Sequence, residues 1–483
     1  MEYVIIGSGV AGIAAIEAIR SVDTAGEITL IGSDPHGYYS RPGLAYYLTG
    51  EIPDKVLFSK RPEDFQNLDV QPLHGTVKRI LRAEQHVELE GREYVHYDRL
   101  LLAVGALATP LDVPGSQFDG VFKLDHLTDA RQIVKNAKRG KIAVVVGGGI
   151  TALELVEGLV AQGMNVHYLL RGDRYWSNVL DFQESKIIEQ RLMQEGVELH
   201  YHADLAEING KQNRVSSVCL KNNTSLQCDM LAYAIGVQPQ THLAKQAALE
   251  VDRGILVDEY MQTNDPNIFA AGDVAQVYDP LIKRSVIESL WTPSREQGTT
   301  AGLNMAGRKK TYTKSVALNV TRLAGLTTTI IGTVGQGQDL DLIGIVRGDS
   351  ETWHQLPDST VAQSGFDVNH VRVMVGKQTL LGAVVMGDQT LSNPLQKIIS
   401  NKVNISSIRE DLLNPKANIA EVLVRFWANY KGHKLKVEQR TIPRNLHPAF
   451  SEASETHLHM QKTIPRVAVP GSAPKKHSVR KSV

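Results

Sequence analysis

The stretches Gly7-Ser8-Gly9-Val10-Ala11-Gly12 and Gly147-Gly148-Gly149-Ile150-Thr151-Ala152 decide the fold of this chain. Each follows an apolar run typical of a strand, residues 3–6 and 142–146, and each opens a run typical of a helix. A strand, a glycine turn and a helix place backbone N–H groups and a helix N-terminus where a pyrophosphate binds. One such unit would indicate a dehydrogenase. Two predict that electrons pass from one bound dinucleotide to another.

Length and composition indicate a globular protein of several domains. At 483 residues the chain is too long for one hydrophobic core, so roughly two to four domains are expected. Its formal net charge is zero, which gives no indication of a nucleic-acid partner. Residues 431–483 hold 11 Lys+Arg against 3 Asp+Glu and lack apolar periodicity, so we expect a disordered basic tail.

The chain carries no pattern typical of a membrane or secreted protein. No apolar run approaches the ~20 residues that span a bilayer, and Met1 leads directly into a strand without a cleavable signal. A cytoplasmic location is expected. The two cysteines, Cys219 and Cys228, form no C-x-x-C pair, which argues against dithiol redox chemistry, iron–sulfur ligation and cysteine-rich zinc sites. No metal site is predicted.

The order of the elements predicts an α/β fold with two Rossmann-like, three-layer dinucleotide-binding domains and a C-terminal α+β domain. The predicted boundaries are 1–125 with 254–310 for the first domain, 126–253 for the second, 311–430 for the third and 431–483 for the tail. Residues 70–97 alternate apolar and polar side chains, which predicts a small antiparallel excursion. Helices are expected at 151–162, 185–195, 394–400 and 419–430, and strands at 165–170, 230–235 and 380–386.

The first glycine turn has an acid at the expected distance. Asp34 follows the second predicted strand and is suited to accept the adenosine ribose hydroxyls, with Ser33 as the alternative if the strand ends one residue earlier. Farther on, residues 267–274 form a strand that runs into a turn, and this turn presents Asp273 at the expected start of a helix. Asp273 could therefore be a helix N-cap, a ligand contact or both.

Three motifs give the chain a family resemblance. Beside the first glycine turn stand Tyr97-Asp98-Arg99-Leu100-Leu101-Leu102-Ala103-Val104-Gly105 and Ala271-Gly272-Asp273. Over residues 1–310 the chain resembles the two-dinucleotide flavoproteins, which include the pyridine-nucleotide disulfide reductases and the rubredoxin and ferredoxin reductases. The resemblance implies that the first site holds FAD, that Asp273 contacts its ribityl–pyrophosphate region, and that Gly105 lets the chain pass close to it. Val77 resembles the residue whose backbone contacts adenine, and Gly236 closes the second domain beside the cofactors.

The second glycine turn lacks the acid that usually selects NADH. After the strand at 165–170 come Arg171 and Arg174, which can face a 2′-phosphate with bidentate hydrogen bonds. An arginine here resembles the NADPH-binding pattern of glutathione reductase, so NADPH is favoured. The alternative is that both arginines are solvated and NADH serves as well. Glu154 resembles the acid that the family places beside the nicotinamide and the flavin, or else is a first-turn acid stabilised by the helix dipole.

The segment at residues 36–47 lacks a thiol that some relatives carry. Residues 36–47 resemble the family's flavin-flanking segment, in which one branch carries a catalytic cysteine where this chain has Pro42. The rubredoxin-reductase-like branch often has Lys-Pro where Arg41-Pro42 stand here. Arg41 is thus a candidate contact for the flavin or its pyrophosphate, or else a surface charge. Trp291 begins a stretch that lies beside the flavin in relatives, where an aromatic side chain could limit access, or else it is a core residue.

The C-terminal part sets the limits of the functional prediction. Residues 381–388 look most like the flavin half of NAD(P)H nitrite reductase, whose module builds a dimer interface and the acceptor-side wall of the flavin pocket. We therefore predict an FAD-dependent oxidoreductase, expected to be a homodimer, that moves hydride from NADPH or NADH to FAD and on to an external acceptor, such as a small redox protein, without a redox-active disulfide. The amphipathic segment 420–430 and the basic tail leave open a membrane-surface NAD(P)H:quinone dehydrogenase. A flavin-binding redox sensor with negligible turnover is the third alternative.

Overall fold

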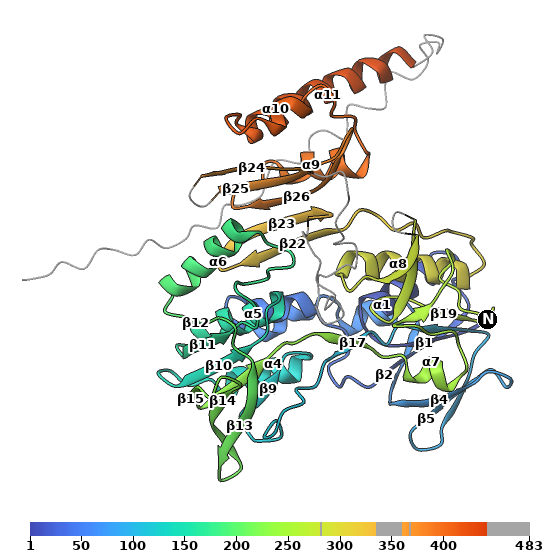
Figure 1. The fold of residues 1–483 in the computed structure, drawn as a ribbon. Coiled ribbons are helices and arrows are strands. Elements are labelled where there is room, and N and C mark those ends of the chain that lie inside the picture. The colour runs from blue at the N-terminus through green and yellow to red at the C-terminus, as the bar shows by residue number, and fades with distance from the viewer. Residues whose placement is uncertain (281–282, 335–359, 367–368, 442–483) are drawn as a thin grey trace, which may run out of the picture. The chain divides into compact units, whose positions relative to one another are not determined.

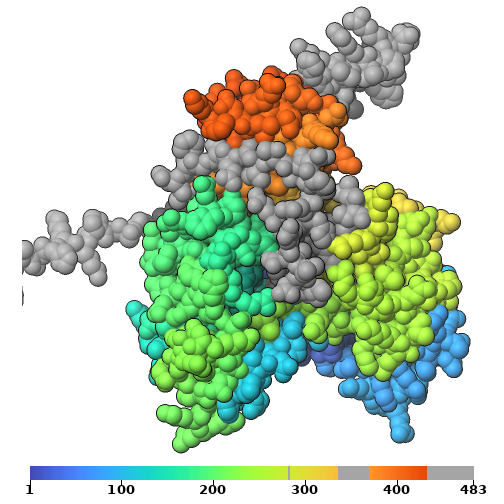
Figure 2. All heavy atoms as spheres, in the orientation of Figure 1, coloured from blue at the N-terminus to red at the C-terminus, as the bar shows by residue number. Residues whose placement is uncertain are grey.

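The computed structural model describes residues 1–280, 283–334, 360–366 and 369–441; all others are grey in Figure 1 and in Figure 2. The described residues up to Trp427 form one compact unit, and those from Ala428 to Thr441 belong to a second. The architecture below belongs to the first unit.

A parallel sheet is built on the first glycine turn. Five of the described strands pair in the order β19-β7-β1-β2-β3. The side chains of these strands are mostly apolar because helices cover both faces of such a parallel sheet. Helices α1 (Val10–Arg20) and α8 (Trp291–Met305) lie side by side in Figure 1. The strand bounds are Glu2–Ile6 (β1), Glu27–Gly32 (β2), Val70–His74 (β3), Arg99–Leu102 (β7) and Ile268–Ala270 (β19).

A second parallel sheet is built on the second glycine turn. Five described strands pair in the order β12-β11-β10-β16-β9, with α5 (Ile150–Ala161) leaving the turn after β10. Helices α4 (Leu127–Asn136) and α6 (Phe182–Gln194) belong to the same part of the chain. The strand bounds are Val121–Lys123 (β9), Ile142–Val146 (β10), Asn165–Leu169 (β11), Glu198–His200 (β12) and Met230–Tyr233 (β16).

The chain crosses between the two sheets along a pair of short strands. β8 (Ala106–Ala108) follows the first sheet's β7, β17 (Val237–Pro239) follows the second sheet's β16, and the two pair antiparallel. The remaining small elements are β4 (Val77–Leu81), β5 (His86–Leu89), β6 (Tyr94–His96), β13 (Leu205–Lys211), β14 (Arg214–Leu220), β15 (Ser225–Gln227), β18 (Ile255–Leu256), β20 (Ala275–Asp279), β21 (Arg284–Ile287), α2 (Leu44–Leu48), α3 (Pro62–Asn67) and α7 (His242–Gln246).

The C-terminal part of the first unit is an antiparallel sheet with helices. Five described strands pair in the order β22-β23-β26-β25-β24. Ile330 and Val384 of this sheet share an apolar core with Leu153 and Val156 of α5, so the third sheet packs onto the second domain. The element bounds are Leu318–Leu323 (β22), Leu326–Gly332 (β23), Thr360–Phe366 (β24), Asn369–Val375 (β25), Leu380–Met386 (β26), Ser392–Ser400 (α9) and Arg409–Leu413 (α10). Helix α11 (Ile419–Thr441) begins in the first unit and continues past Trp427 into the second.

The predicted fold class is confirmed: two Rossmann-like sheets and a C-terminal α+β part. Two local predictions were wrong. β3 is a parallel strand of the first sheet, not part of an antiparallel excursion, because its main-chain partner β2 lies far away in sequence. Helix α11 runs to Thr441, beyond its expected end at 430, while residues 442–483 of the predicted tail lie outside the described residues.

The boundary predicted between the first two domains, at 125/126, falls after β9, which pairs with β16 in the second sheet. Over the described ranges, no helix combines the length and the apolar character that crossing a bilayer requires.

Candidate functional site

The first glycine turn is closed toward protein and open toward solvent. A Cβ at Gly7 would lie 2.2 Å from the Ala103 carbonyl oxygen, and one at Gly12 would lie 2.1 Å from the Gly7 carbonyl oxygen. A Cβ at Gly9 would meet no heavy atom of the described residues within 4 Å. Gly9 is also the N-cap of α1, and no side chain caps it. The backbone N–H groups in the first turn of α1 therefore face open space, and a phosphate can approach the backbone closely there.

The second glycine turn repeats this arrangement with one difference. A Cβ at Gly147 would lie 2.2 Å from the Ala234 carbonyl oxygen, and Gly149 is an N-cap of α5 without a side-chain cap. At Gly148 a Cβ would again meet no described heavy atom within 4 Å. The last position of the turn is Ala152, whose side chain is buried. Both turns thus fit the pyrophosphate of a dinucleotide.

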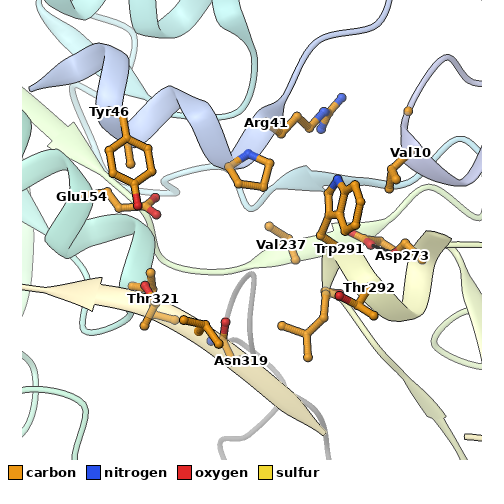
Figure 3. A pocket seen from close by; sticks show the side chains of 18 of the residues that line it. Val10, Arg41, Tyr46, Glu154, Val237, Asp273, Trp291, Thr292, Asn319 and Thr321 are labelled. Carbon is orange, nitrogen blue, oxygen red and sulfur yellow. Dashed lines mark hydrogen bonds between the residues drawn. The ribbon is translucent and has the colours of Figure 1, made fainter. Parts of the chain in front are cut away.

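A pocket lies between the two turns. Figure 3 shows Tyr46 and Glu154 close together at one end and Trp291, Asp273 and Val10 toward the other. The crossing strands contribute Ala106 and Val237 to its lining, and β22 contributes its residues from the C-terminal sheet. Of the predicted site residues, those that line it are Gly9, Val10, Arg41, Pro42, Ile150, Glu154, Asp273 and Trp291. The pocket therefore joins the N-terminal ends of α1 and α5.

Arg41 and Pro42 form one wall. They open a short 3-10 turn, Arg41–Gly43, which leads directly into α2. An Arg41 guanidinium nitrogen lies 3.4 Å from His126 Nδ1, so the cation is held by α4's N-cap residue while it lines the pocket. The prediction that Arg41 contacts the cofactor remains a prediction.

The C-terminal sheet supplies a second cation that sequence analysis missed. The Arg322 guanidinium of β22 lies 5.1 Å from the centre of the Tyr46 ring and donates to both carboxylate oxygens of Glu51, at 2.8 and 2.5 Å. Arg322 and Tyr46 both line the pocket. The sequence around Arg322 does not indicate this role, because β22 and α2 are far apart in the chain and meet only in the folded protein.

Two glutamates of α5 line the pocket one turn apart. Glu154 was predicted, and Glu157 was not. The Glu157 carboxylate accepts a hydrogen bond from the Gly325 N–H at 3.0 Å. Burial raises the pKa of the Glu157 carboxyl to about 7, and the nearby Arg322 opposes that shift. Glu157 could have been predicted from its spacing of three residues from Glu154, which places both acids on one helix face.

The start of α8 forms the opposite wall. Asp273 accepts a hydrogen bond from Ser294 Oγ at 3.0 Å, and Gln297 Oε1 accepts from the Gly272 N–H at 2.9 Å. The Trp291 side chain is 46% exposed, with the Arg295 guanidinium 6.0 Å from its ring centre. The expectation that Asp273 begins a helix was wrong, because the residues after it form β20. Its carboxylate instead meets the first turn of α8 through Ser294.

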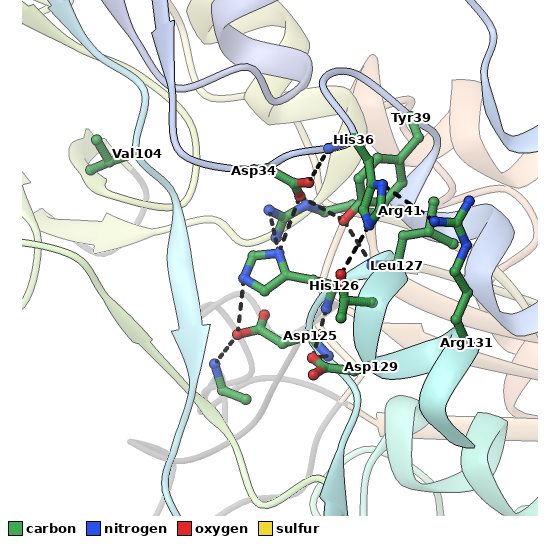
Figure 4. Close-up of polar contacts among 12 residues, drawn as sticks. Asp34, His36, Tyr39, Arg41, Val104, Asp125, His126, Leu127, Asp129 and Arg131 are labelled. Carbon is green, nitrogen blue, oxygen red and sulfur yellow. Dashed lines mark hydrogen bonds and ion pairs between the residues drawn. The ribbon is translucent and has the colours of Figure 1, made fainter. Parts of the chain in front are cut away.

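Asp34 follows β2, as predicted, but its partners are protein groups. Figure 4 shows the His126 ring between Asp34 and Asp125. Asp34 accepts from the His36 N–H at 2.9 Å and the Tyr39 hydroxyl at 3.1 Å. Burial alone would raise the pKa of Asp34, but hydrogen bonds from His126, His36 and Tyr39 lower it to about 2. Asp34 is not among the described residues that line the pocket.

The remaining predicted residues lie around the pocket. Gly105 and Gly236 have φ values of +69° and +128° and lead into the paired strands β8 and β17. Val77 begins β4, buried, outside the lining.

The two arginines follow β11, also outside the lining. Arg171 is exposed, whereas Arg174 donates to the Ser177 carbonyl at 3.0 Å and pairs with Asp173 at 3.0 Å. Their predicted contact with a 2′-phosphate remains a prediction.

Both cysteines of the chain lie in the second domain's small sheet region. Cys219 belongs to β14 and Cys228 follows β15, and both are free thiols. Neither lines the pocket, and burial raises the pKa of the Cys228 thiol to about 12.

The chain is similar in sequence and in fold to known proteins. The profile of the family described as "Pyridine nucleotide-disulphide oxidoreductase" matches residues 1–298. The nitrite reductase [NAD(P)H] of Bacillus subtilis is 27% identical over 84% of this chain and 48% of its own length. The rubredoxin-NAD(+) reductase of Ectopseudomonas oleovorans is 31% identical over 58% of this chain and 73% of its own. The chain spans about half the length of the Bacillus relatives, nitrite reductase and the assimilatory nitrate reductase electron transfer subunit.

Solved structures share the fold. The putidaredoxin reductase–putidaredoxin complex matches 88% of this chain and 98% of its own with a TM-score of 0.77 at 23% identity. An engineered water-forming NADPH oxidase bound to NADPH matches 91% of this chain and 100% of its own with a TM-score of 0.75 at 22% identity.

Proposed function

Because the chain belongs to the pyridine nucleotide-disulphide oxidoreductase family, we propose that it is a flavoprotein oxidoreductase that takes hydride from NAD(P)H and passes electrons to an external acceptor. The observation that carries the proposal is the pocket that joins two glycine turns, each opening a helix whose N-terminus no side chain caps. A single dinucleotide would need only one such turn.

We assign FAD to the first turn and to the predicted segments 1–125 and 254–310. Gly9 and the N-terminus of α1 would hold the pyrophosphate, and Asp273 would hold the ribityl–pyrophosphate region from the opposite wall. Arg41 and Pro42 would border the flavin, with Trp291 limiting access from the start of α8. When bound, the flavin supplies the hydride and electron chemistry, and the protein supplies position and electrostatics.

We assign the nicotinamide dinucleotide to the second turn and to segment 126–253, and we favour NADPH. The N-terminus of α5 would hold its pyrophosphate, and the exposed Arg171 follows β11 where the adenosine ribose of such folds lies. The Arg171 side chain is exposed, so a 2′-phosphate can approach it from solvent, and Arg171 is the candidate that we test. Glu154, on α5 in the pocket, would orient the nicotinamide against the flavin.

The acceptor is proposed to be a separate one-electron carrier, such as a small redox protein. Neither Cys219 nor Cys228 is among the described residues that line the pocket, and Pro42 stands where the family resemblance implies a cysteine in thiol-dependent relatives. Electrons that leave the flavin would therefore pass directly to the acceptor. The named relatives include reductases of rubredoxin and putidaredoxin, which supports this class of partner.

The test is an anaerobic turnover assay on the purified, flavin-loaded protein with NADPH as donor. Separate reactions receive a rubredoxin, a [2Fe–2S] ferredoxin and a soluble quinone, each followed by its own absorbance change. Reduction of an iron–sulfur or rubredoxin carrier at least tenfold faster than of quinone supports the proposal. Preference for quinone would favour a quinone dehydrogenase, and flavin that no donor reduces would favour a redox sensor. Either outcome would overturn the proposed acceptor class.

A further inference from the structure

Three potential metal ligands meet at the edge of the second sheet. β12 is the terminal strand of that sheet and pairs with β11. His167 of β11 is directly opposite Glu198 of β12, and His200 lies two residues farther along β12. Residues two apart on a strand point to the same face, so all three side chains share one side of the sheet.

The spacing of their donor atoms matches a first coordination shell. His167 Nδ1 lies 3.0 Å from His200 Nε2, Glu198 Oε2 lies 3.4 Å from His167 Nδ1, and Glu198 Oε1 lies 3.5 Å from His200 Nε2. Two ligands bound to Zn²⁺ at about 2.0–2.1 Å in tetrahedral geometry stand about 3.3 Å apart. A metal ion could therefore take all three donors with little movement of the backbone.

The surroundings suit an ion that enters from solvent. The two histidine side chains are each 19% exposed, and that of Glu198 is 64% exposed, so the ligands are positioned by packing but can be reached. Two imidazoles and one carboxylate are typical ligands of divalent transition metals, and three protein donors leave a coordination position for water.

The other cluster of this kind among the described residues lacks these properties. Asp181, Glu184 and His370 also bring their donor atoms together. There the buried Arg372 guanidinium already donates to both Glu184 oxygens at 2.9 Å, so a cation is built into the chain. A second cation would be repelled, so that cluster is already satisfied by Arg372.

We propose that His167, Glu198 and His200 bind one divalent transition-metal ion of the Zn²⁺ class, which cross-links the edge strand β12 to β11. The site adjoins the loop that carries Arg171, through main-chain hydrogen bonds between that loop and β12. In that loop the Leu170 N–H donates to the His200 carbonyl at 2.8 Å, and the Ala203 N–H donates to the Leu170 carbonyl at 3.0 Å. The ion would thus hold the strand pair from which the proposed phosphate-binding arginine extends, although the site itself does not depend on the proposed function.

The test is isothermal titration of the full flavin-loaded chain, first stripped with a chelator and dialysed, with ZnCl₂ and separately with MgCl₂. We expect one Zn²⁺ per chain with micromolar or tighter affinity and no Mg²⁺ binding. The double variant His167→Ala/His200→Ala should lose Zn²⁺ affinity more than 100-fold, since loss of even an outer partner costs about 10- to 100-fold. Zn²⁺ should raise the melting temperature of the wild type but not of the double variant, because an ion that binds only the folded state stabilises it.

A matched control comes from another histidine pair. His86 and His96 face each other across β5 and β6 with ring centres 5.1 Å apart, and they do not form a three-donor cluster with any described acid. His86→Ala/His96→Ala should keep the wild-type affinity and stoichiometry. A wild type that binds no Zn²⁺ at 100 μM would overturn the proposal without any variant. So would equal Zn²⁺ losses in the two double variants, both checked for a wild-type flavin spectrum.

Discussion

The two glycine turns differ in what lies behind them. At the first turn, the backbone itself is in contact: Cβ atoms at Gly298 and Gly302 of α8 would lie 2.1 and 2.3 Å from the Ala11 and Ala15 carbonyl oxygens of α1. The helix that leaves the second turn instead meets a side chain near its C-terminal end, since a Cβ at Gly158 of α5 would lie 2.7 Å from Leu48 Cβ. Backbone contacts cannot adjust, whereas side chains can repack. A rigid pairing of α1 with α8 suits a cofactor that stays bound, and a more adaptable packing of α5 suits a nucleotide that exchanges.

The largest expected effect comes from the last residue of each turn. Gly12→Ala places a methyl group 2.1 Å from the Gly7 carbonyl oxygen, so we expect a loss of at least about 3 kcal/mol in stability together with most of the bound flavin. The reverse change at the second turn, Ala152→Gly, should cost at most about 1 kcal/mol and leave the flavin content unchanged. The ratio of flavin absorbance to protein, with a melting curve, checks both. Equal effects of the two variants would remove the contrast between the turns.

The next effect concerns the donor. Arg171→Glu should raise the KM for NADPH about 10- to 100-fold, because a hydrogen bond to a charged group is worth about 1.5–3 kcal/mol, and the KM for NADH should change by less than about threefold. Steady-state kinetics with both donors measures this. Lys221→Glu is the control, since Lys221 is an exposed cation of the same domain paired with Asp204. Parallel changes in both KM values would show that Arg171 does not recognise the 2′-phosphate.

Helices α1 and α5 also carry glutamates at the same distance from their turns, with opposite surroundings. The Glu17 side chain is 35% exposed and lies 2.7 Å from Lys60 Nζ, whereas Glu157 is half-buried in the pocket with a pKa of about 7. This folded-state pKa exceeds the ordinary value of 4.5, so the folded protein keeps a proton that the unfolded chain releases. Stability from Glu157 is therefore full below about pH 4.5 and is lost as pH rises through about 7.

Glu157→Gln should remove that loss. Relative to the wild type, the variant should gain roughly 3 kcal/mol at pH 8 and much less at pH 5. Glu17→Gln should change stability by less than about 1 kcal/mol at both pH values, as expected for a surface ion pair. Urea unfolding at pH 5 and pH 8 measures the differences. A Glu157→Gln variant with the same stability change at both pH values would contradict a carboxyl whose pKa is raised in the folded protein.

The smallest expected effect lies at the start of α8. Trp291→Ala should leave the rate of flavin reduction by NADPH within about twofold, since Trp291 belongs to the wall opposite Glu154. Reoxidation by oxygen should become a few-fold faster because less of the pocket is covered. Stopped-flow absorbance measures the two half-reactions separately. A large loss in the reductive half-reaction would place Trp291 on the donor side instead.

Local sequence patterns predicted much of the fold and one side of the site. The glycine turns, β26 and α5 follow from apolar runs and from residues whose backbone position excludes a Cβ, so a single sequence reveals them. β3 was mistaken because its alternating residues resemble a hairpin strand, while its partner β2 lies far away in the chain. Arg322 could not be predicted for the same reason: β22 belongs to the C-terminal sheet, and only the tertiary fold brings that sheet to the pocket.

The surroundings of predicted residues were also beyond local patterns. Asp34 was placed correctly after β2, but its contacts with Tyr39 and His126 depend on how α4 packs. Glu157 shares a helix face with Glu154, and this spacing was visible in the sequence; its burial, which raises its pKa, was not.

The central claim is that the two turns hold different dinucleotides and that electrons cross the pocket between them. Anaerobic stopped-flow mixing of the flavin-loaded protein with NADPH tests it most directly, by following the flavin absorbance near 450 nm. The account predicts one FAD per chain and complete bleaching within the time of one turnover, faster with NADPH than with NADH. A purified protein that is colourless and takes up no FAD, or a bound flavin that neither donor bleaches, would contradict it.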